Sequence, residues 1–275
     1  MHVADQIREL FDRPDAEVDL GRAAATLARL EYPDADIEAC MRRIDAYAGK
    51  VGARLDKGRP RETAVSAINK LLFEELGFRG NREDYYDPRN SFLNDVLERR
   101  TGIPISLSVL YLEIAKRLEL PIYGVGLPSH FVVKYDDRSR LFFVDPYHEG
   151  RVLNQQGCRE LVKTLHGRPV DLHDLHFAAV ENRSIVLRML NNLRAIYLSA
   201  RRHRLALEVL DTILALEPDS AEEIKQRAWV RYELGERGSA LRDLERYVDL
   251  RPNGADAEQV QDWMNKLRRT LAHLN

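Results

Sequence analysis

The sequence predicts an α+β fold that is mostly helical, and three observations lead to this class. Apolar residues recur at helical spacing through residues 1–76, 92–100 and 106–118. Residues 122–145 instead read as strands, because β-branched and aromatic runs are separated there by turn residues. The last ninety or so residues carry a repeat with a 34-residue period, which is typical of paired helices.

Composition limits the class of protein. The 275 residues are 44% hydrophobic, which is enough for a substantial core in one or two domains. The formal net charge is −2, from 42 basic and 44 acidic residues, and this balance argues against a nucleic-acid partner. Two cysteines far apart fit a reducing compartment better than a disulfide framework. We find no signal peptide and no membrane-spanning run, so we expect a cytoplasmic protein with no membrane partner.

The first 76 residues are expected to form four helices. Their predicted ranges are Asp5–Phe11, Ala16–Leu30, a helix capped by Asp36 that continues through Leu55, and Glu62–Leu76 after a break at Gly58–Pro60. Cys40 falls on the third helix, where a small buried apolar side chain is the expected role.

Residues 78–90 form a loop that is dense in charged, amide and aromatic groups and has no apolar period. Two interpretations stay open, a solvated connector and the polar lining of a pocket. The candidate pocket-lining residues are Tyr85, Tyr86, Asn90 and Asn81. A helix over 92–100 follows, with Ser91 or Asn90 as its expected cap.

The centre of the chain combines a helix with a hairpin. A helix over 106–118 is followed by strands at 122–127, 130–135 and 141–145. If the second turn is centred on Asp137-Arg138, His130 lies directly opposite Asp145, with Cβ atoms about 4.5–5.5 Å apart. A carboxylate there can orient the imidazole and raise its pKa. The pair therefore matches the second half of a nucleophile–His–Asp triad.

After Asp145 we expect a short strand and a helix that Asn154 caps and that reaches about His166. Cys158 lies in its first turn and is interpreted as structural. His166, His173 and His176 match no common ligand spacing, so we expect neither a metal nor another cofactor.

The tail repeats a set of anchor residues. Ala206-Leu207, Leu210 and Pro218 recur 34 positions later as Ala240-Leu241, Leu244 and Pro252. Because two repeats cannot bury their faces alone, a last helix over 256–274 should cap one end. We expect domains at 1–180 and 181–275, with the repeats docked on the core.

The segments GIPISLSVLYLEIAKRLELP, HFVV and VDP resemble the transglutaminase-like superfamily of cysteine peptidases and transglutaminases. The resemblance implies a catalytic His at His130 and Asp at Asp145, but it aligns the nucleophilic cysteine with Pro104. Over nearly the whole chain, GFRGNREDYYDPRNSFLNDVLERRTGIPISL, PSHFVV and the repeats are similar to bacterial SirB-type proteins. Those pair a transglutaminase-like core with a tetratricopeptide-like tail of paired helices.

Two functions from different classes follow. In the first, the protein is non-catalytic and binds a protein or peptide through its repeats and cleft, with His130 and Asp145 as a structural remnant. In the alternative, it is a hydrolase or acyl transferase that uses Ser106 or Ser108 as nucleophile with His130 and Asp145. Ser106 has a structural interpretation as a helix cap, and Ser108 as a small packing residue. The sequence does not predict an oligomeric state.

Overall fold

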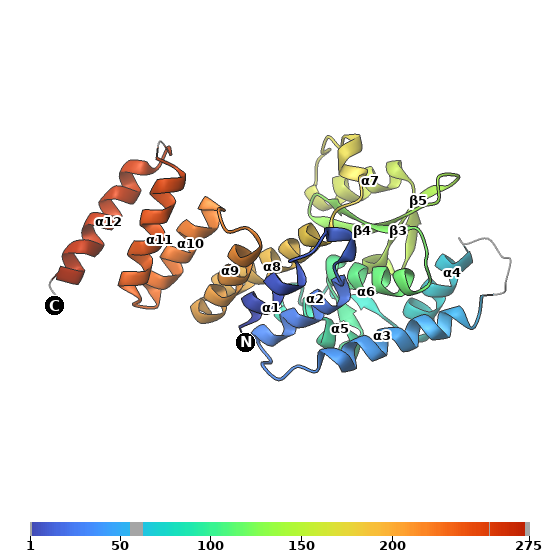
Figure 1. Cartoon of the computed structure of the whole chain (residues 1–275). Helices are drawn as coiled ribbons and strands as arrows, with labels where there is room; N and C mark the ends of the chain where they lie inside the picture. Colours follow the sequence, from blue (N-terminus) through green and yellow to red (C-terminus); the bar gives the residue numbers. More distant parts are fainter. Residues whose placement is uncertain (1, 56–62, 253, 273–275) are drawn as a thin grey trace. The chain divides into compact units, whose positions relative to one another are not determined.

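The computed structural model describes residues 2–55, 63–252 and 254–272. Contacts group the chain into a core unit, Arg13–Met189, and a repeat unit that joins Met1–Asp12 to Leu190–Asn275. The expected mostly helical α+β class is confirmed (Figure 1). The division into domains at residue 180 stays a prediction, because a compact unit need not fold independently. The predicted break at Gly58–Pro60 lies outside the described residues.

The core unit begins with helices that aspartates cap. α2 (Leu20–Thr26) starts after Asp19, whose carboxylate accepts the N–H of Arg22 at 2.9 Å. This cap makes the predicted single helix over 16–30 wrong. The 3₁₀ turn η1 (Asp15–Glu17) precedes the cap, and η2 (Leu27–Leu30) tightens the end of α2. α3 (Ile37–Gly52) has the predicted Asp36 cap, and α4 (Thr63–Asn69) continues as the π-helical η3 (Lys70–Glu75).

The loop before the central helix contains structure that the sequence does not predict. β1 (Arg79–Gly80) pairs in parallel with β2 (Thr101–Gly102). Each strand is only two residues long, which is too short to show the alternating pattern that predicts a strand. Between them lie η4 (Pro88–Asn90) and α5 (Leu93–Arg99). The predicted cap of α5 is wrong, because Phe92 occupies the N-cap without a side-chain hydrogen bond. Asn90 is engaged within the loop instead.

A four-stranded antiparallel sheet follows the central helix α6 (Pro104–Arg117) in the order β3-β4-β5-β6. The strands are β3 (Ile122–Leu127), β4 (His130–Asp136), β5 (Leu141–Asp145) and β6 (Arg151–Leu153). The predicted ranges of the first three are confirmed within one residue, and β6 is the short strand expected after Asp145. α6 packs on β3 and β4, while α7 (Gln155–His166) covers the other face (Figure 1). Both faces are therefore buried. This explains why the strands read as nearly continuous apolar runs.

The hairpin between β4 and β5 turns later than predicted. Asp136 pairs with Leu141, so Arg138 and Ser139 form the turn, and the register moves by two residues. The cause is Asp137, whose carboxylate accepts the N–H groups of Ser139 at 3.0 Å and Arg140 at 2.8 Å. The prediction that His130 lies directly opposite Asp145 is wrong. Because a shift of two preserves the face, the two residues are diagonal neighbours on one face.

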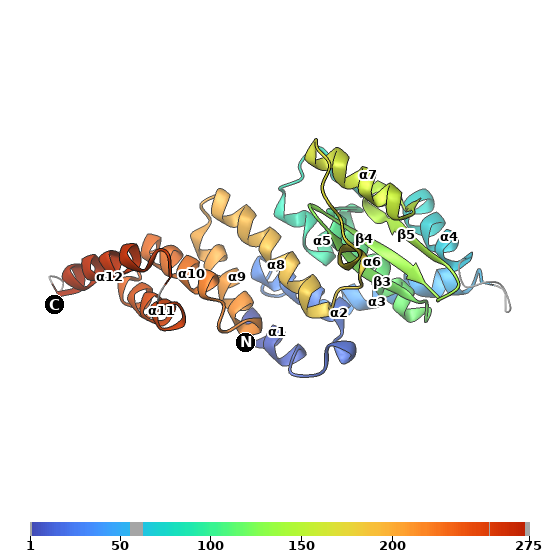
Figure 2. The ribbon, with the colours of Figure 1, turned by 90° about the horizontal axis from the view of Figure 1, so that it is seen from above.

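The repeat unit stacks helices in chain order: α9 (His203–Leu216), α10 (Ala221–Glu233), α11 (Arg237–Leu250) and α12 (Ala257–Ala272), which follow α8 (Asn182–Ser199). The repeated anchors Ala206, Leu210, Ala240 and Leu244 are fully buried. α1 (Val3–Leu10), from the other end of the sequence, packs on α9 (Figures 1 and 2). α1 thus covers part of the α9 surface.

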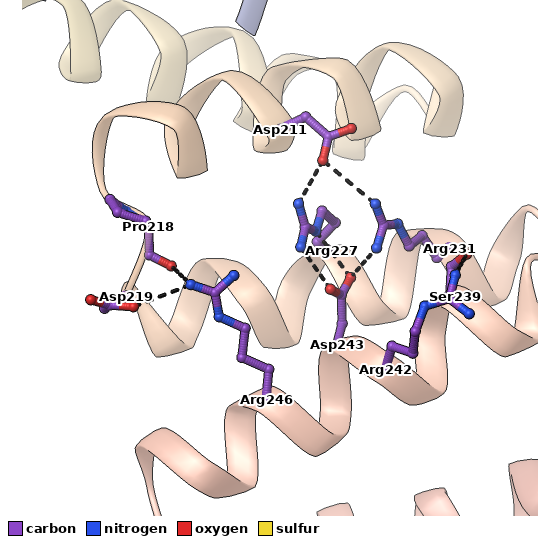
Figure 3. A network of polar contacts seen from close by, with 9 residues as sticks. All are labelled: Asp211, Pro218, Asp219, Arg227, Arg231, Ser239, Arg242, Asp243 and Arg246. Atoms are coloured by element: carbon purple, nitrogen blue, oxygen red, sulfur yellow. Dashed lines mark hydrogen bonds and ion pairs between the residues drawn. The ribbon is translucent and has the colours of Figure 1, made fainter. Parts of the chain in front are cut away.

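Three helices of the repeat unit share a polar network (Figure 3). Asp243 of α11 accepts from Arg227 of α10 at 2.7 and 3.0 Å and from Arg231 of α10 at 2.8 Å. Asp211 of α9 accepts from Arg227 at 2.7 Å. The two arginines neutralise the two aspartates, so the network joins three helices without net charge.

Across the described residues, none of the helices combines the length and the apolar character needed to cross a membrane.

Candidate functional site

The two residues predicted as a triad remnant meet in the core unit. Nε2 of His130, at the start of β4, lies 3.0 Å from Oδ2 of Asp145, at the end of β5. Their side chains are only 2% and 1% exposed, so little solvent screens the interaction. With Nε2 bound to the carboxylate, Nδ1 is the ring nitrogen left for a reacting group.

A second imidazole, from His148, binds the same carboxylate oxygen. His148 Nδ1 lies 2.7 Å from Oδ2 of Asp145, and the two imidazole rings stack with centroids 5.6 Å apart. The other oxygen, Oδ1, accepts the N–H groups of Tyr147 at 3.1 Å and His148 at 3.3 Å. Asp145 thereby caps the 3₁₀ turn η5 (Pro146–His148). One oxygen of this carboxylate organises the backbone and the other binds two rings.

The protonation of Asp145 reflects these partners. Burial alone raises the pKa of a carboxyl group, but the hydrogen bonds from His130 and His148 hold the pKa of Asp145 well below its ordinary value. The group is therefore a carboxylate throughout the neutral range.

Tyr147 connects this cluster to a neighbouring pocket. Its ring contacts His130 and His148 edge to face, and its hydroxyl donates to the carbonyl oxygen of Asn81 at 2.9 Å. A Cβ at Gly80 would come within 2.4 Å of the Tyr147 ring, so β1 needs glycine there. The pocket has a volume of about 450 Å³. It is lined by Arg79, Gly80, Asn81, Arg82, Glu83, Arg99, Thr101, Tyr147 and Glu149.

Arg188 of α8 fixes the turn that carries His130. Its Nη2 donates to the carbonyl oxygens of Leu127 at 2.9 Å and His130 at 2.7 Å, and its guanidinium lies over the Phe131 ring. Ser129 in this turn has φ 56°, which costs a residue with a Cβ some conformational energy. The hydrogen bonds from Arg188 offset that cost and hold the backbone of His130 in place.

The candidate nucleophiles of the central helix are engaged elsewhere. Pro104 is the first residue of α6. Ser106 Oγ donates to the carbonyl oxygen of Asn90 at 2.6 Å and accepts the N–H of Ile103 at 3.1 Å. Ser108 Oγ lies 3.5 Å from the carbonyl oxygen of Phe131. Both serines are fully buried, and among the described residues neither hydroxyl hydrogen-bonds to His130.

The two cysteine thiols are also unsuited to catalysis. Both are buried, Cys40 in α3 and Cys158 in α7. Burial raises the pKa of each thiol to about 12, and the charge of Asp145 adds to the effect at Cys158. A thiol is nucleophilic as the thiolate, so both groups are inert near neutral pH.

The loop candidates separate into two kinds. Asn90 is fully buried, and its amide donates to the carbonyl oxygens of Asp84 at 2.7 Å and Tyr85 at 3.2 Å. Asn81 donates to Asn90 Oδ1 at 3.0 Å and also lines the pocket. Tyr85 packs against Tyr147, whereas Tyr86 is largely exposed. The two asparagines hold the loop together, and Asn81 reaches the pocket.

The histidines after the sheet lie apart from this cluster. His173 Nε2 lies 3.6 Å from Oδ2 of Asp171 on the surface, and the N–H of His173 donates to His176 Nδ1 at 3.0 Å. His166 ends α7. Within the described residues these side chains do not form a three-ligand group.

Comparisons with known proteins identify the family. The model of the transglutaminase-like superfamily matches residues 38–191, more than half of the chain. The chain belongs to the transglutaminase-like superfamily. A tetratricopeptide-repeat model matches residues 193–265, which confirms the repeats and indicates a role in protein–protein interaction. This transglutaminase-like protein therefore has the architecture expected from the SirB-type resemblance.

The transglutaminase-like protein has bacterial relatives along most of its length. A UPF0162 protein of Xylella fastidiosa is 36% identical over 252 residues, which cover 90% of this chain and 89% of the relative. One from Vibrio cholerae is 28% identical, over 97% of this chain and 96% of the relative. Human F-box only protein 21 is 31% identical over 62% of this chain but only 28% of its own length. The structure of menin matches at 13% identity with a TM-score of 0.49, and the match covers 97% of this chain and 61% of menin. A match at this level supports no argument about the fold.

Two residues of the site were missed by sequence reasoning. The position of His148 could have been predicted from the local sequence, because Asp145-Pro146 favours an Asx turn that places residue 148 next to residue 145 in a 3₁₀ turn. No sequence pattern predicts the role of Arg188, because its hydrogen bonds go to backbone carbonyls far away in sequence.

Proposed function

We propose that this transglutaminase-like protein is non-catalytic and acts by binding a protein or peptide partner. The observation that carries the proposal is Pro104. It opens α6 at the position that the resemblance assigns to the cysteine nucleophile. A helix N-terminus can activate a thiol, but a pyrrolidine ring offers neither a nucleophile nor an N–H donor.

The engaged serines support the same proposal. The Ser106 hydroxyl proton is given to a backbone carbonyl, and its lone pair accepts a backbone N–H. A serine nucleophile needs a base within about 2.6–3.2 Å. To react with His130 as its base, Ser106 would have to break hydrogen bonds that hold the start of α6 to the loop.

The binding surface we infer lies in the repeat unit. A pocket of about 450 Å³ is lined by Arg194, Glu222, Glu223, Lys225, Gln226, Trp229 and Trp263. Its charges are paired internally, since Lys225 contacts Glu222 and Asp256 and Arg194 contacts Glu223. The exposed Trp229 and the partly buried Trp263, next to neutralised charges, suit a peptide that presents an apolar anchor.

Partner capture tests the binding role. The intact protein is immobilised, and the amount of each bound protein recovered from a cell lysate is compared between the parent and two variants. Trp229→Ala removes a 40% exposed aromatic from the proposed surface, and Tyr123→Ala removes a 46% exposed aromatic from the core unit as a matched control. We expect Trp229→Ala to lose a partner that Tyr123→Ala retains. Equal recovery by both variants contradicts the proposed surface.

The alternative enzyme is a serine hydrolase or acyl transferase, which the 3.0 Å contact between His130 and Asp145 favours. A fluorophosphonate probe separates the two functions, because it labels an activated serine covalently. We expect no labelling of the parent protein. Stoichiometric labelling that Ser106→Ala or Ser108→Ala abolishes would show that the protein is an enzyme.

A further inference from the structure

The second imidazole at Asp145 needs an explanation that a triad remnant does not give. A triad uses one imidazole and one carboxylate. Here His130 and His148 both direct a ring nitrogen at the same oxygen of Asp145, at 3.0 and 2.7 Å. The three ligand atoms lie within 4.8 Å of one another. Of the residues that the structure describes, only these form such a group of three or more metal-ligating side chains.

The spacing of these atoms fits a small divalent ion. Zn²⁺ binds imidazole nitrogens and carboxylate oxygens at about 2.0–2.2 Å, so two ligands of a tetrahedral ion lie about 3.3 Å apart. The observed nitrogen–oxygen distances are a few tenths of an ångström shorter. The third pair, the two imidazole nitrogens, lies within 4.8 Å. An ion that replaces the ring N–H protons therefore moves each nitrogen a few tenths of an ångström away from Oδ2 and places the two nitrogens about 3.3 Å apart.

The ligands are held by groups that stay in place when a proton is exchanged for an ion. Two backbone N–H groups fix Oδ1 of Asp145 and leave Oδ2 for binding. Arg188 fixes the backbone of His130, and η5 carries His148. Such outer contacts orient ligands in known metal sites. His148 is 27% exposed and provides a path from solvent to the otherwise buried group.

We propose that His130, Asp145 and His148 form a binding site for a divalent transition-metal ion, with Zn²⁺ as the first candidate. Two imidazoles and one carboxylate suit Zn²⁺, Co²⁺ or Ni²⁺ better than Mg²⁺ or Ca²⁺, which prefer oxygen ligands. Three protein ligands leave one position of a tetrahedral ion for water. The inference goes beyond partner binding and does not depend on it.

The test uses the full chain after a chelator has been applied and removed. Zn²⁺ binding is measured by calorimetry, and Co²⁺ binding by its visible absorption, whose intensity reports four-coordinate geometry. We expect one equivalent of either ion. His148→Gln and His130→Gln should weaken Zn²⁺ binding by at least roughly tenfold. His173→Gln, which removes an exposed imidazole beside Asp171, should leave Zn²⁺ affinity unchanged.

Two results would overturn the proposal. One is the absence of a stoichiometric Co²⁺ band in the parent protein, a measurement that no variant's folding can affect. The other is Zn²⁺ binding that survives His148→Gln and is lost in His173→Gln, which would place the ion on the surface. Circular dichroism shows whether His148→Gln and His130→Gln retain the parent's helical content. If either variant loses helical content, the test rests on whether the parent protein shows the stoichiometric four-coordinate Co²⁺ band.

Discussion

The ion network of the repeat unit gives a quantitative prediction for stability. Asp243 is 5% exposed and accepts three hydrogen bonds from two guanidinium groups (Figure 3). In Asp243→Asn the side chain keeps its shape but loses its charge, so Arg227 and Arg231 share only Asp211, which is 37% exposed. Breaking a buried ion pair by removing one partner costs about 3–5 kcal/mol. Because both guanidiniums keep some contact with water, we take the lower end, about 3 kcal/mol.

Thermal unfolding followed by circular dichroism measures this cost. A loss of about 3 kcal/mol lowers the Tm by about 6–12 °C if the whole chain unfolds together, and by more if the repeat unit unfolds alone. Asp219→Asn is the matched control, since its 77% exposed carboxylate also accepts from an arginine, Arg246. Exposed pairs contribute about 0–1 kcal/mol. Hydrogen exchange should localise the weakening to α9, α10 and α11.

A double variant tests the electrostatic reasoning itself. Adding Arg227→Met to Asp243→Asn removes one positive charge and leaves Arg231 with Asp211, so the network is neutral again. Part of the lost stability should return, because the unpaired buried charge is gone. If Asp243→Asn is no less stable than Asp219→Asn, or if the double variant is simply the sum of its parts, the network does not act as an ion cluster.

Three further predictions concern the core unit. Asp145→Asn should cost stability at neutral pH. Because the pKa of Asp145 is lowered in the folded protein, the carboxylate contributes its full stabilisation above the unfolded pKa, near 3.9, and loses it as the pH falls through the lower folded pKa. The urea midpoints of the parent and Asp145→Asn should therefore converge in acid, and a difference that stays constant with pH would contradict this. In Pro104→Cys the new thiol should alkylate with an apparent pKa below that of an ordinary cysteine, and it should react more slowly when His130→Ala is added. An ordinary thiol pKa in both variants would refute the idea that the cleft keeps the geometry of a cysteine enzyme. The double variant Cys40→Ser, Cys158→Ser should bind the same partners as the parent, and loss of binding with retained stability would show that a thiol matters.

Elements with strong local signals could be predicted from the sequence. The strand ranges follow from β-branched and aromatic runs, and the start of α3 follows from Asp36, which accepts the N–H of Ala39. The 34-residue repeat predicts paired helices, because Ala206 and Leu210 are buried for the same geometric reason as Ala240 and Leu244.

Features that depend on contacts between distant residues could not be predicted. β1 and β2 are two residues each and pair across the loop between them. The packing of α1 on α9 joins residues 3–10 to residues 203–216. The register of the central hairpin is a different case, because the contacts that decide it are local. It depended on whether Asp137 lies inside the turn or before it, and the hydrogen bonds from Ser139 and Arg140 to its carboxylate decide this. The strand assignments were correct while the pairing was wrong, because periodicity fixes a face but not a partner.

The two oxygens of Asp145 explain why a His–Asp pair need not indicate catalysis here. Oδ1 accepts the backbone N–H groups that start η5, so this carboxylate has a folding role whether or not a nucleophile is present. Oδ2 then meets His130 and His148 because η5 lies beside the start of β4, where the His130 ring contacts Tyr147 and His148. A loss of function in Asp145→Asn therefore cannot by itself distinguish chemistry from structure. His148→Gln is more informative, because it leaves the cap and the His130 contact in place and removes only the feature that a catalytic pair does not require.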